Sequence, residues 1–523
     1  MRPNSSIRFY AFTAAVFLIV VGVGITFRSS FPQPGEVIEG FKSFRPLHDN
    51  HDQAQHQPPQ APEESPLIHA PAPVTTAHAQ VKASPADKLS TSSTLSTAPW
   101  SPTQYDEVPL PDLDKWPGPG PDGLYGDLTD LISEEFHRYS NEDQKKRHLN
   151  ITSKMTSHKK FMKIDWLGDH EGYNPSLIPH PSKENTWIVI AQRDKHNDDN
   201  THHSQELLCE ATFVDDMIRC TRSPLMLPIA STTSNYCDEA MGWFNTNMGP
   251  HDARLYHGRD RPYVMYNQQS AYSCVGQWLQ DARRLVDYDG NITDRTENFF
   301  QPINLQKVGG KYGMVEKNWY LFWDNKGEVY IHHNLSPRRL FGKLNPDGSV
   351  GRDLSAASQT HDTACMARLM PKLRNTTWEY IHQASNALEI TLCKRADADC
   401  TPTDDNTFIF HIFQTKTFYA HGQYEPYFIL FKRTAPFELY AISKTPFWYF
   451  GRGTAFGKWR LEPKKPKDQS QMIFTTAMGW KQRGQTYGGF LDDELMISFG
   501  VEDKHSGVID VTVGDLIADV AYC

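Results

Sequence analysis

Polar residues of the kinds used in catalysis recur beyond residue 170, in small groups that lie beside apolar segments. A carboxylate that meets a second acid can transfer a proton at a glycosidic bond. Converging lysine, arginine and histidine side chains can hold a phosphate or diphosphate leaving group, on which charge builds in the transition state. The residues concerned are Asn174, Arg193, Asp252, Arg254, Glu316, Lys317, Trp319, His332, His333, His421 and Asp503. These residue types predict acid/base chemistry next to a bound anion.

Each group also has a purely structural interpretation. Asp252 can form an ion pair with Arg254 or an Asx turn at a strand end, and Lys317 can be a solvated surface lysine. The histidine pair can close an ordinary strand, and Asp503 can belong to a turn. The repetition of a polar group beside one predicted strand after another favours the functional interpretation.

Short segments rich in aromatic and β-branched residues must position these groups. Most of these segments are bounded by Gly, Pro, Asn or Asp, which is the signature of strands. They cover residues 186–193, 261–268, 318–324, 327–333, 407–415, 426–433, 437–444, 494–500 and 507–513. So many short strands favour a β-propeller, which closes a large all-β chain by radial repetition. We therefore predict an all-β, five-bladed β-propeller over residues 155–523, with residues 507–513 pairing near the start of the domain to close the ring.

Helical periodicity is scarce in this sequence. The best candidate covers residues 124–139, within a partly helical lead-in at residues 106–154. Residues 280–287 and 362–370 predict short helical turns, the second of which ends before Pro371.

The N-terminal region predicts a membrane anchor and a stem. The 19 residues from 9 to 27 contain no charge and no proline, and as a helix they would span about 28 Å, the thickness of a bilayer core. A cleavable signal peptide is the alternative, although its apolar region is usually shorter. Residues 1–8 would form a cytoplasmic tail. Residues 28–105 are rich in Pro, Ser and Thr and too polar to bury a core, so they predict a disordered stem.

The cysteines and the charge balance predict an exported domain. All eight cysteines lie between Cys209 and Cys523, which suits an oxidising compartment, although free buried thiols are the alternative. Cys209/Cys220 and Cys393/Cys400 are close enough in sequence to link the strands of hairpins. Glycosylation sequons occur at Asn150, Asn291, Asn334 and Asn375. This layout predicts a single-pass type II membrane protein of the Golgi or ER with a lumenal domain. The net charge of −9 does not indicate a basic surface that would bind nucleic acid, so no nucleic-acid partner is predicted.

The order of the polar groups resembles that of five-bladed β-propeller carbohydrate enzymes. These are the β-mannoside phosphorylases and hydrolases and, through Glu316-Lys317-Asn318-Trp319, the fungal β-1,2-mannosyltransferases. The resemblance runs from about residue 160 to 515 as scattered short motifs. The phosphorylases carry E-D-P-R, whose aspartate transfers the proton, where this chain has His251-Asp252-Ala253-Arg254. The preceding acid and the proline are therefore lost here, which disfavours phosphorolysis.

The resemblance implies a role for each residue. Asp252 would be the acid/base, and Arg254 and Lys317 would contact phosphate, joined by one of the two histidines. Asp503 would contact sugar hydroxyls. From residue type and position we add Asn174, Arg193, Glu316, Trp319 and His421 as substrate-binding residues, with Trp319 offering a stacking face.

The sequence thus predicts a membrane-anchored glycosyltransferase that moves a sugar, mannose being one candidate, from a nucleotide-sugar donor to a glycan or glycoconjugate. A glycoside hydrolase or phosphorylase and a non-catalytic carbohydrate-binding propeller are the alternatives. No cofactor is predicted beyond the donor as co-substrate. Asp112-Leu113-Asp114 and Asp397-Ala398-Asp399 have the D-x-D pattern of metal-dependent transferases, but neither follows a buried strand in an α/β context, so we predict no metal site.

Overall fold

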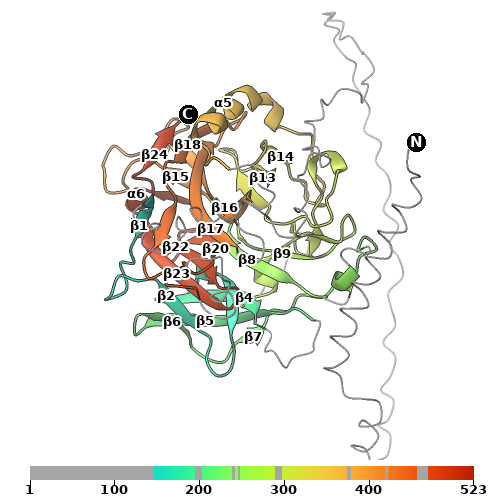
Figure 1. Cartoon of the computed structure of the whole chain (residues 1–523), viewed down its shortest axis with the longest axis vertical. Coiled ribbons are helices and arrows are strands. Elements are labelled where there is room, and N and C mark those ends of the chain that lie inside the picture. Colours follow the sequence, from blue (N-terminus) through green and yellow to red (C-terminus); the bar gives the residue numbers. More distant parts are fainter. Residues whose placement is uncertain are drawn as a thin grey trace, which may run out of the picture. The chain divides into compact units, whose positions relative to one another are not determined.

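β-strands, most of them paired antiparallel, are the main regular structure of the chain that the structure describes (Figure 1). In this computed structural model the described residues are 147–194, 203–237, 242–245, 248–288, 297–373, 379–417, 422–455 and 469–523. The α-helices within these ranges are α5 (Gln359–Leu369) and α6 (Val513–Leu516). The predicted all-β class is confirmed.

Most strands fall into five successive antiparallel groups. The first is β3 (Gly172–Pro179), β4 (Thr186–Arg193), β5 (Glu206–Val214) and β6 (Met217–Cys220); the second is β8 (His251–His257), β9 (Pro262–Gln269), β10 (Val275–Asp281) and β11 (Ile303–Asn304). The third is β12 (Tyr320–Trp323), β13 (Val329–Asn334) and β14 (Leu340–Lys343). The fourth is β15 (Tyr380–Thr391), β16 (Thr407–Thr417), β17 (Gln423–Lys432) and β18 (Leu439–Ser443); the fifth is β20 (Ile473–Trp480), β22 (Glu494–Val501) and β23 (His505–Thr512).

Shorter elements extend these groups. Parallel pairs join β1 (Leu149–Ile151) to β19 (Phe447–Tyr449), and β21 (Gly488–Phe490) to β15. The antiparallel additions are β7 (Leu225–Met226) on β5 and β24 (Val520–Tyr522) on β18. The 3-10 turns are η3 (Gly242–Asn245), η4 (Ala282–Arg284), η5 (Val308–Gly310) and η6 (Ser355–Ala357).

The strand β2 (Met162–Asp165) joins the last group to the first. It pairs antiparallel with β23, where Met162 faces Val508, and parallel with β6, where Ile164 faces Ile218. In Figure 1 the red C-terminal strands accordingly run beside the teal strands from the start of the described chain. The predicted pairing of residues 507–513 with the start of the domain is confirmed.

Hydrogen bonds connect the first strands of the five groups in a closed order. The donor and acceptor pairs are Leu255 N to Ser176 Oγ (2.7 Å), Arg254 Nη2 to Asn318 Oδ1 (2.6 Å), Gln383 Nε2 to Asn318 O (2.9 Å), Met478 N to Asn386 Oδ1 (2.8 Å) and Thr476 Oγ1 to Pro175 O. They link β3 to β8, β8 to the residues before β12, these residues to β15, β15 to β20 and β20 back to β3. The five first strands therefore surround a common centre.

Four of these first strands carry a bulge at the level of those bonds. Register shifts occur in β3 between Tyr173 and Ser176, in β8 between His251 and Arg254, and also in β15 and β20. A bulge inserts an extra residue and re-aims a side chain. The inserted Asn174 has a φ of 52°, a left-handed conformation that asparagine and aspartate tolerate best. The bulges thus turn polar side chains toward the centre of the ring.

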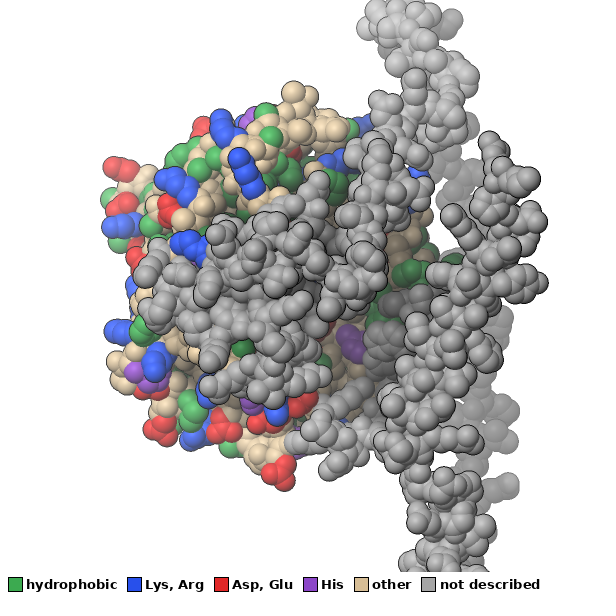
Figure 2. All heavy atoms as spheres, in the orientation of Figure 1, with side chains coloured by type: hydrophobic (Ala, Val, Ile, Leu, Met, Phe, Trp, Pro, Cys, Tyr) green, Lys and Arg blue, Asp and Glu red, His purple; other side chains and the backbone are tan. Residues whose placement is uncertain are grey.

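All eight cysteines form disulfides. Cys209–Cys220 joins β5 to β6, and Cys393–Cys400 closes the turn between β15 and β16, as predicted. Cys237–Cys274 and Cys365–Cys523 are the other two, and the last ties α5 to the C-terminal residue. Basic and acidic side chains are interspersed over the described part of the face in Figure 2.

The predicted helices, the membrane anchor, the stem and the sequons have different outcomes. The helix α5 confirms the prediction for residues 362–370, whereas residues 280–287 form only the turn η4. The anchor, the stem and residues 124–139 lie outside the described ranges. Within those ranges no helix is long and apolar enough to cross a membrane. Asn150 is exposed and Asn334 is partly buried, while the sequons at Asn291 and Asn375 lie outside the described residues.

Candidate active site

Asp252 occupies the bulge of β8 and faces the bulge of β3. Its φ is 52°, and its Oδ1 accepts a hydrogen bond of 2.8 Å from Asn174 Nδ2. The Oδ1 of Asn174 is buried and has no hydrogen-bond partner within the described chain, so it is available as an acceptor. The two residues that the sequence singled out 78 positions apart therefore form one unit.

Two buried side chains of the first strand group hold this bulge in place. Gln192 Oε1 accepts the backbone N–H of Asp252 at 3.0 Å, and Glu206 Oε1 accepts that of Ala253 at 3.1 Å. Gln192 and Glu206 are paired across β4 and β5. The left-handed turn at Asp252 is thus fixed by consecutive backbone bonds as well as by Asn174.

Glu206 is fully buried beside Asp252, with 0% of its surface exposed. Its Oε2 has no hydrogen-bond partner in the described part of the chain. Burial raises the pKa of Glu206 well above its ordinary value, against the opposing bond from Ala253 N–H, and the charge of Asp252 raises it further. Folding therefore favours the protonated, neutral form of the Glu206 carboxyl. The sequence analysis missed it because it opens a strand with no motif around it.

Replacing Glu206 by glutamine should stabilise the protein increasingly as the pH rises above 4.5. A carboxyl whose pKa is raised by folding binds a proton that the unfolded chain has lost, so the wild type loses stability from pH 4.5 upward. Glutamine keeps the acceptor for Ala253 N–H and does not titrate. The measurement is the melting temperature of both proteins between pH 4 and pH 8, with the exposed Glu184→Gln as control. A difference that does not change with pH would contradict a neutral Glu206.

Asp503 lies close to the same unit. Burial, followed by the charges of Asp252 and Asp503, raises the pKa of Tyr173. Burial and the same two carboxylates also raise the pKa of Tyr424. Gly500, three residues before Asp503, packs against Asn174. A side chain at position 500 would prevent this contact, because its Cβ would lie only 2.0 Å from Asn174 Oδ1. The loop after β22 therefore brings a second carboxylate to the centre.

Two lysines lie near Tyr424: the Nζ of Lys416 is 5.7 Å from the centre of its ring, and Lys317 is close to Lys416. Burial and the charge of Lys317 lower the pKa of Lys416, which is half-buried at the end of β16. Neither lysine forms an ion pair with a carboxylate among the described residues. Burial and both lysines lower the pKa of His382 to about 4, so this imidazole is neutral. The charge of Asp503 acts on Lys416 in the opposite direction. Two neighbouring cations, neither in a direct ion pair among the described residues, can hold an anion. Lys416 and His382 were not found from the sequence, because they lie inside apolar strands.

Arg254 is a buried residue of β8, two positions after Asp252. It is 4% exposed, and its Nη2 donates to Asn318 Oδ1 at 2.6 Å. Burial lowers its pKa to about 10, so it remains charged at neutral pH. The charge of Asp252 acts on it in the opposite direction. Arg254 therefore supplies a buried positive charge close to Asp252.

The two predicted histidines lie inside the third strand group. His332 is fully buried between the rings of Tyr320 and Phe341, with centroids 4.8 and 5.6 Å away. Burial lowers its pKa well below the ordinary value and lowers that of His333 to about 3. The Trp319 ring is 2% exposed and meets His333 edge-on at 4.4 Å. The structure thus places these three rings in the core, and their predicted substrate contacts stay predictions.

Two other predicted site residues, Glu316 and Arg193, form hydrogen bonds with residues close to them in the sequence. Glu316 Oε1 accepts hydrogen bonds from Lys307 Nζ at 2.7 Å and Gly313 N at 2.6 Å. Arg193 Nη1 donates to Gln205 Oε1 at 2.7 Å. His421 lies outside the described residues. Their roles in binding likewise stay predictions.

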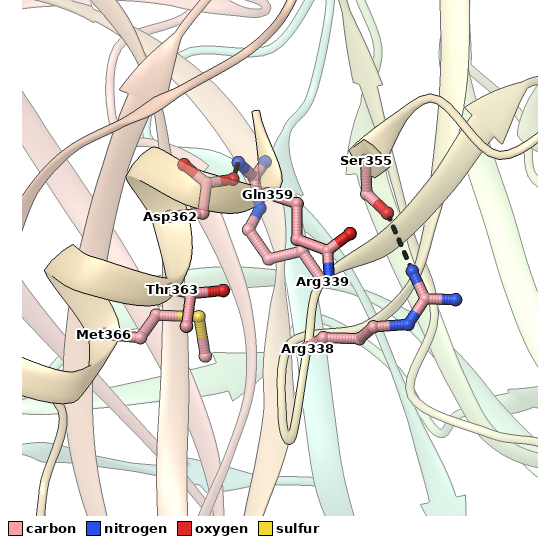
Figure 3. A pocket seen from close by; sticks show the side chains of 7 residues that line it. All are labelled: Arg338, Arg339, Ser355, Gln359, Asp362, Thr363 and Met366. Carbon is pink, nitrogen blue, oxygen red and sulfur yellow. Dashed lines mark hydrogen bonds and ion pairs between the residues drawn. The ribbon is translucent and has the colours of Figure 1, made fainter. Parts of the chain in front are cut away.

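A small cavity lies at α5, away from this cluster. Its volume is about 10 Å³, which is room for about one water molecule. Figure 3 shows its two arginines engaged with the protein: Arg339 Nη1 lies 2.8 Å from Asp362 Oδ2, and Arg338 Nη1 lies 3.2 Å from Ser355 Oγ. This cavity is too small for a sugar.

A larger cavity of about 550 Å³ lies at the end of β12. The rings of Tyr263, Phe299 and Trp323 line it, and each is at most 4% exposed. Lys343 at its rim pairs with Glu328 at 2.6 Å. It contains no residue of the central cluster.

The described residues include no group of three or more His, Cys, Asp or Glu side chains arranged to hold a metal ion. The D-x-D pattern at Asp397 lies in the disulfide-closed turn, where Asp397 O accepts the N–H of Cys400 at 3.0 Å.

Comparisons with known proteins find similarity in structure and not in sequence. No family model matches it, and no curated protein is similar to it in sequence. Similar solved structures include a glycosyl hydrolase from Bacteroides ovatus, with 14% identity, a TM-score of 0.36 and coverage of 69% of this chain and 91% of that one. A β-1,2-mannobiose phosphorylase from Listeria innocua has 12% identity, a TM-score of 0.36 and coverage of 71% and 96%. A GDP-Man-dependent mannosyltransferase from Leishmania mexicana has 11% identity, a TM-score of 0.35 and coverage of 67% and 89%. The similar structures thus include a phosphorylase and a mannosyltransferase, the two kinds of enzyme that the sequence resembles.

Proposed function

We propose that this chain is a glycosyltransferase built on a five-bladed β-propeller, and that it moves a sugar from a nucleotide-sugar donor to a glycan or glycoconjugate. The five strand groups would be the blades. The observation that carries the proposal is the set of charged groups around Tyr424: Asp252 and Asp503 act on its hydroxyl, and Lys416, which is close to Lys317, has its Nζ 5.7 Å from the centre of the ring. The roles in this site divide between carboxylates, which can accept a proton, and lysines, which supply positive charge.

The reaction follows from this division. The acceptor hydroxyl oxygen attacks the anomeric carbon of the sugar, and Asp252 takes the hydroxyl proton. The bond between that carbon and the diphosphate oxygen breaks, and its electron pair leaves with the diphosphate. Lys317 and Lys416 offset the negative charge that grows on the leaving oxygen. Asn174 and Asp503 would hold sugar hydroxyls, and Arg254 would position Asp252.

The predicted anchor at residues 9–27 supports a donor of this kind. An enzyme anchored in the Golgi or ER membrane, with four disulfides in its lumenal domain, would work where nucleotide sugars serve as donors. The membrane location is part of this proposal.

A phosphorylase or hydrolase is the second candidate. It is favoured by the two carboxylates, Asp252 and Asp503, that act on the same tyrosines. A pair of carboxylates is the usual equipment for cleaving glycosides, and the lysines would hold inorganic phosphate equally well.

Removing Lys317 or Lys416 should lower sugar transfer by about 10²-fold, because the leaving diphosphate would lose a fixed positive charge. The experiment incubates the purified full chain with GDP-mannose and UDP-sugars in the presence of glycan acceptors. A parallel set contains mannosides with phosphate or with water alone. Lys394→Ala, at an exposed lysine of the disulfide-closed turn, is the matched control.

The products decide between the candidates. A transferred sugar with release of nucleotide supports the transferase, whereas sugar phosphate or free sugar supports the second candidate. Activity that survives both Lys317→Ala and Lys416→Ala would rule out the assigned leaving-group site. A folded chain that is inactive on every donor and glycoside would favour a carbohydrate-binding role.

A further inference from the structure

Tyr380, Lys416 and Tyr424 form one row across β15, β16 and β17. Lys416 is the direct cross-strand partner of Tyr380 on one side and of Tyr424 on the other. Residues directly opposite each other on antiparallel strands project from the same face of the sheet. The Nζ of Lys416 lies 5.7 Å from the centre of the Tyr424 ring. A lysine is therefore flanked by a tyrosine on each side.

Two further rings extend this row into an aromatic edge. The ring of His382 lies 6.0 Å from that of Tyr380 and 6.3 Å from that of Tyr424. The ring of Phe474 meets Tyr424 at 5.1 Å. These separations are those of interacting aromatic pairs, which makes the edge a continuous surface.

The row has a direction. Tyr424 is the member that lies close to Asp252 and Asp503, whose charges act on its hydroxyl. Lys416, in the middle, is the member that lies close to Lys317, and the charge of Asp503 also acts on it. Tyr380, at the far end, is 47% exposed. From the centre outward the order is carboxylates, lysine pair and exposed aromatic ring.

We propose that this row binds the nucleoside diphosphate end of the donor, with the diphosphate on Lys416 and Lys317 and the base stacked on Tyr380. The inference rests on the proposed function and names where each part of the donor lies. A nucleotide sugar has the same order as the row: a sugar, a diphosphate and a nucleoside. Tyr380 is two strands from Tyr424, or about 10 Å, so a base can lie on it while the sugar lies near the carboxylates. Stacking on a tyrosine does not depend on the identity of the base.

The test is calorimetric titration of the purified full chain with GDP, UDP and inorganic pyrophosphate. We expect GDP and UDP to bind about 10-fold more tightly than pyrophosphate, because each adds a base that can stack. Pyrophosphate carries at least as much negative charge, so charge cannot produce this preference. Tyr380→Ala should abolish the preference and leave pyrophosphate binding unchanged, whereas Tyr380→Phe should keep it. Lys416→Ala should weaken all three ligands.

The exposed Tyr522→Ala on β24 is the matched control and should change nothing. Equal binding of nucleotides and pyrophosphate by the wild type would overturn the nucleoside site and leave the diphosphate site standing. A preference that persists in Tyr380→Ala would also overturn it, since the base would then lie elsewhere. If none of the three binds at millimolar concentration, the donor site of the proposed function fails as well.

Discussion

Replacing Asp252 by asparagine should lower sugar transfer by about 10²–10⁴-fold, which is the usual contribution of a general acid or base. Asparagine has nearly the same shape, and its side-chain oxygen can still accept the hydrogen bond from Asn174 Nδ2. The backbone bonds from residues 252 and 253 to Gln192 and Glu206 do not involve the side chain of Asp252. The bulge should therefore keep its geometry while the site loses its proton acceptor.

The measurement combines initial rates of transfer with thermal unfolding. The control is Asp347→Asn, which changes a surface carboxylate that bonds to Ser349. We expect both variants to melt within a few degrees of the wild type and only Asp252→Asn to lose activity. Near-normal transfer by folded Asp252→Asn would show that the base is another residue. A failure to fold would instead support a structural ion pair between Asp252 and Arg254.

Replacing Asp510 by alanine should lower the free energy of unfolding by about 3–5 kcal/mol, the usual effect of removing one partner of a buried charged network. Asp510 lies on β23 with 0% of its surface exposed. Its carboxylate accepts hydrogen bonds from Ser153 Oγ, from Lys154 N at 3.1 Å and from Met155 N at 3.0 Å. These bonds hold the segment before β2 against the last strand group, so the change loosens the closure of the ring.

Denaturant unfolding of the variant and the wild type checks this value. The matched control is Asp515→Ala nearby, because the Asp515 side chain is 66% exposed and its pair with Lys154 at 3.6 Å is a surface contact. That variant should lie within about 1 kcal/mol of the wild type. Equal destabilisation by both variants would mean that the carboxylate of Asp510 does not hold the closure.

The sequence predicted the strands in the middle of their groups well, and it also predicted β12, β18 and β23, which stand first or last in theirs. The segments at 186–193, 261–268, 407–415 and 426–433 correspond to β4, β9, β16 and β17. Every residue of β9 is buried, as are all but one of β4. A strand buried on both faces is a continuous apolar run between turn residues, and that pattern is visible without any neighbour.

The first strands of the groups were mostly not predicted as strands. In β3 and β8 the polar residues Asn174 and Asp252 interrupt the apolar pattern, so the sequence places them before a strand and not within one. In β15 the bulge around Asn386 has the same effect. A bulge breaks the alternation of side chains by which a strand is recognised, and here the bulges occur at the site itself.

The sequence by itself determined the all-β class, the hairpin disulfides, the pairing of residues 507–513 with the start of the domain, and the candidacy of Asp252, Arg254 and Lys317. These depend on residue type and local pattern. Only the tertiary structure decided that Asn174 bonds to Asp252, that Glu206 lies buried beside it with a raised pKa, that Lys416 joins Lys317, and that Trp319 and His332 are enclosed in the core. Strand register and ring closure bring together residues that are far apart in the chain. Burial, which shifts the pKa of Glu206 and of His332 toward the neutral form, is a property of those neighbours and not of the residue type.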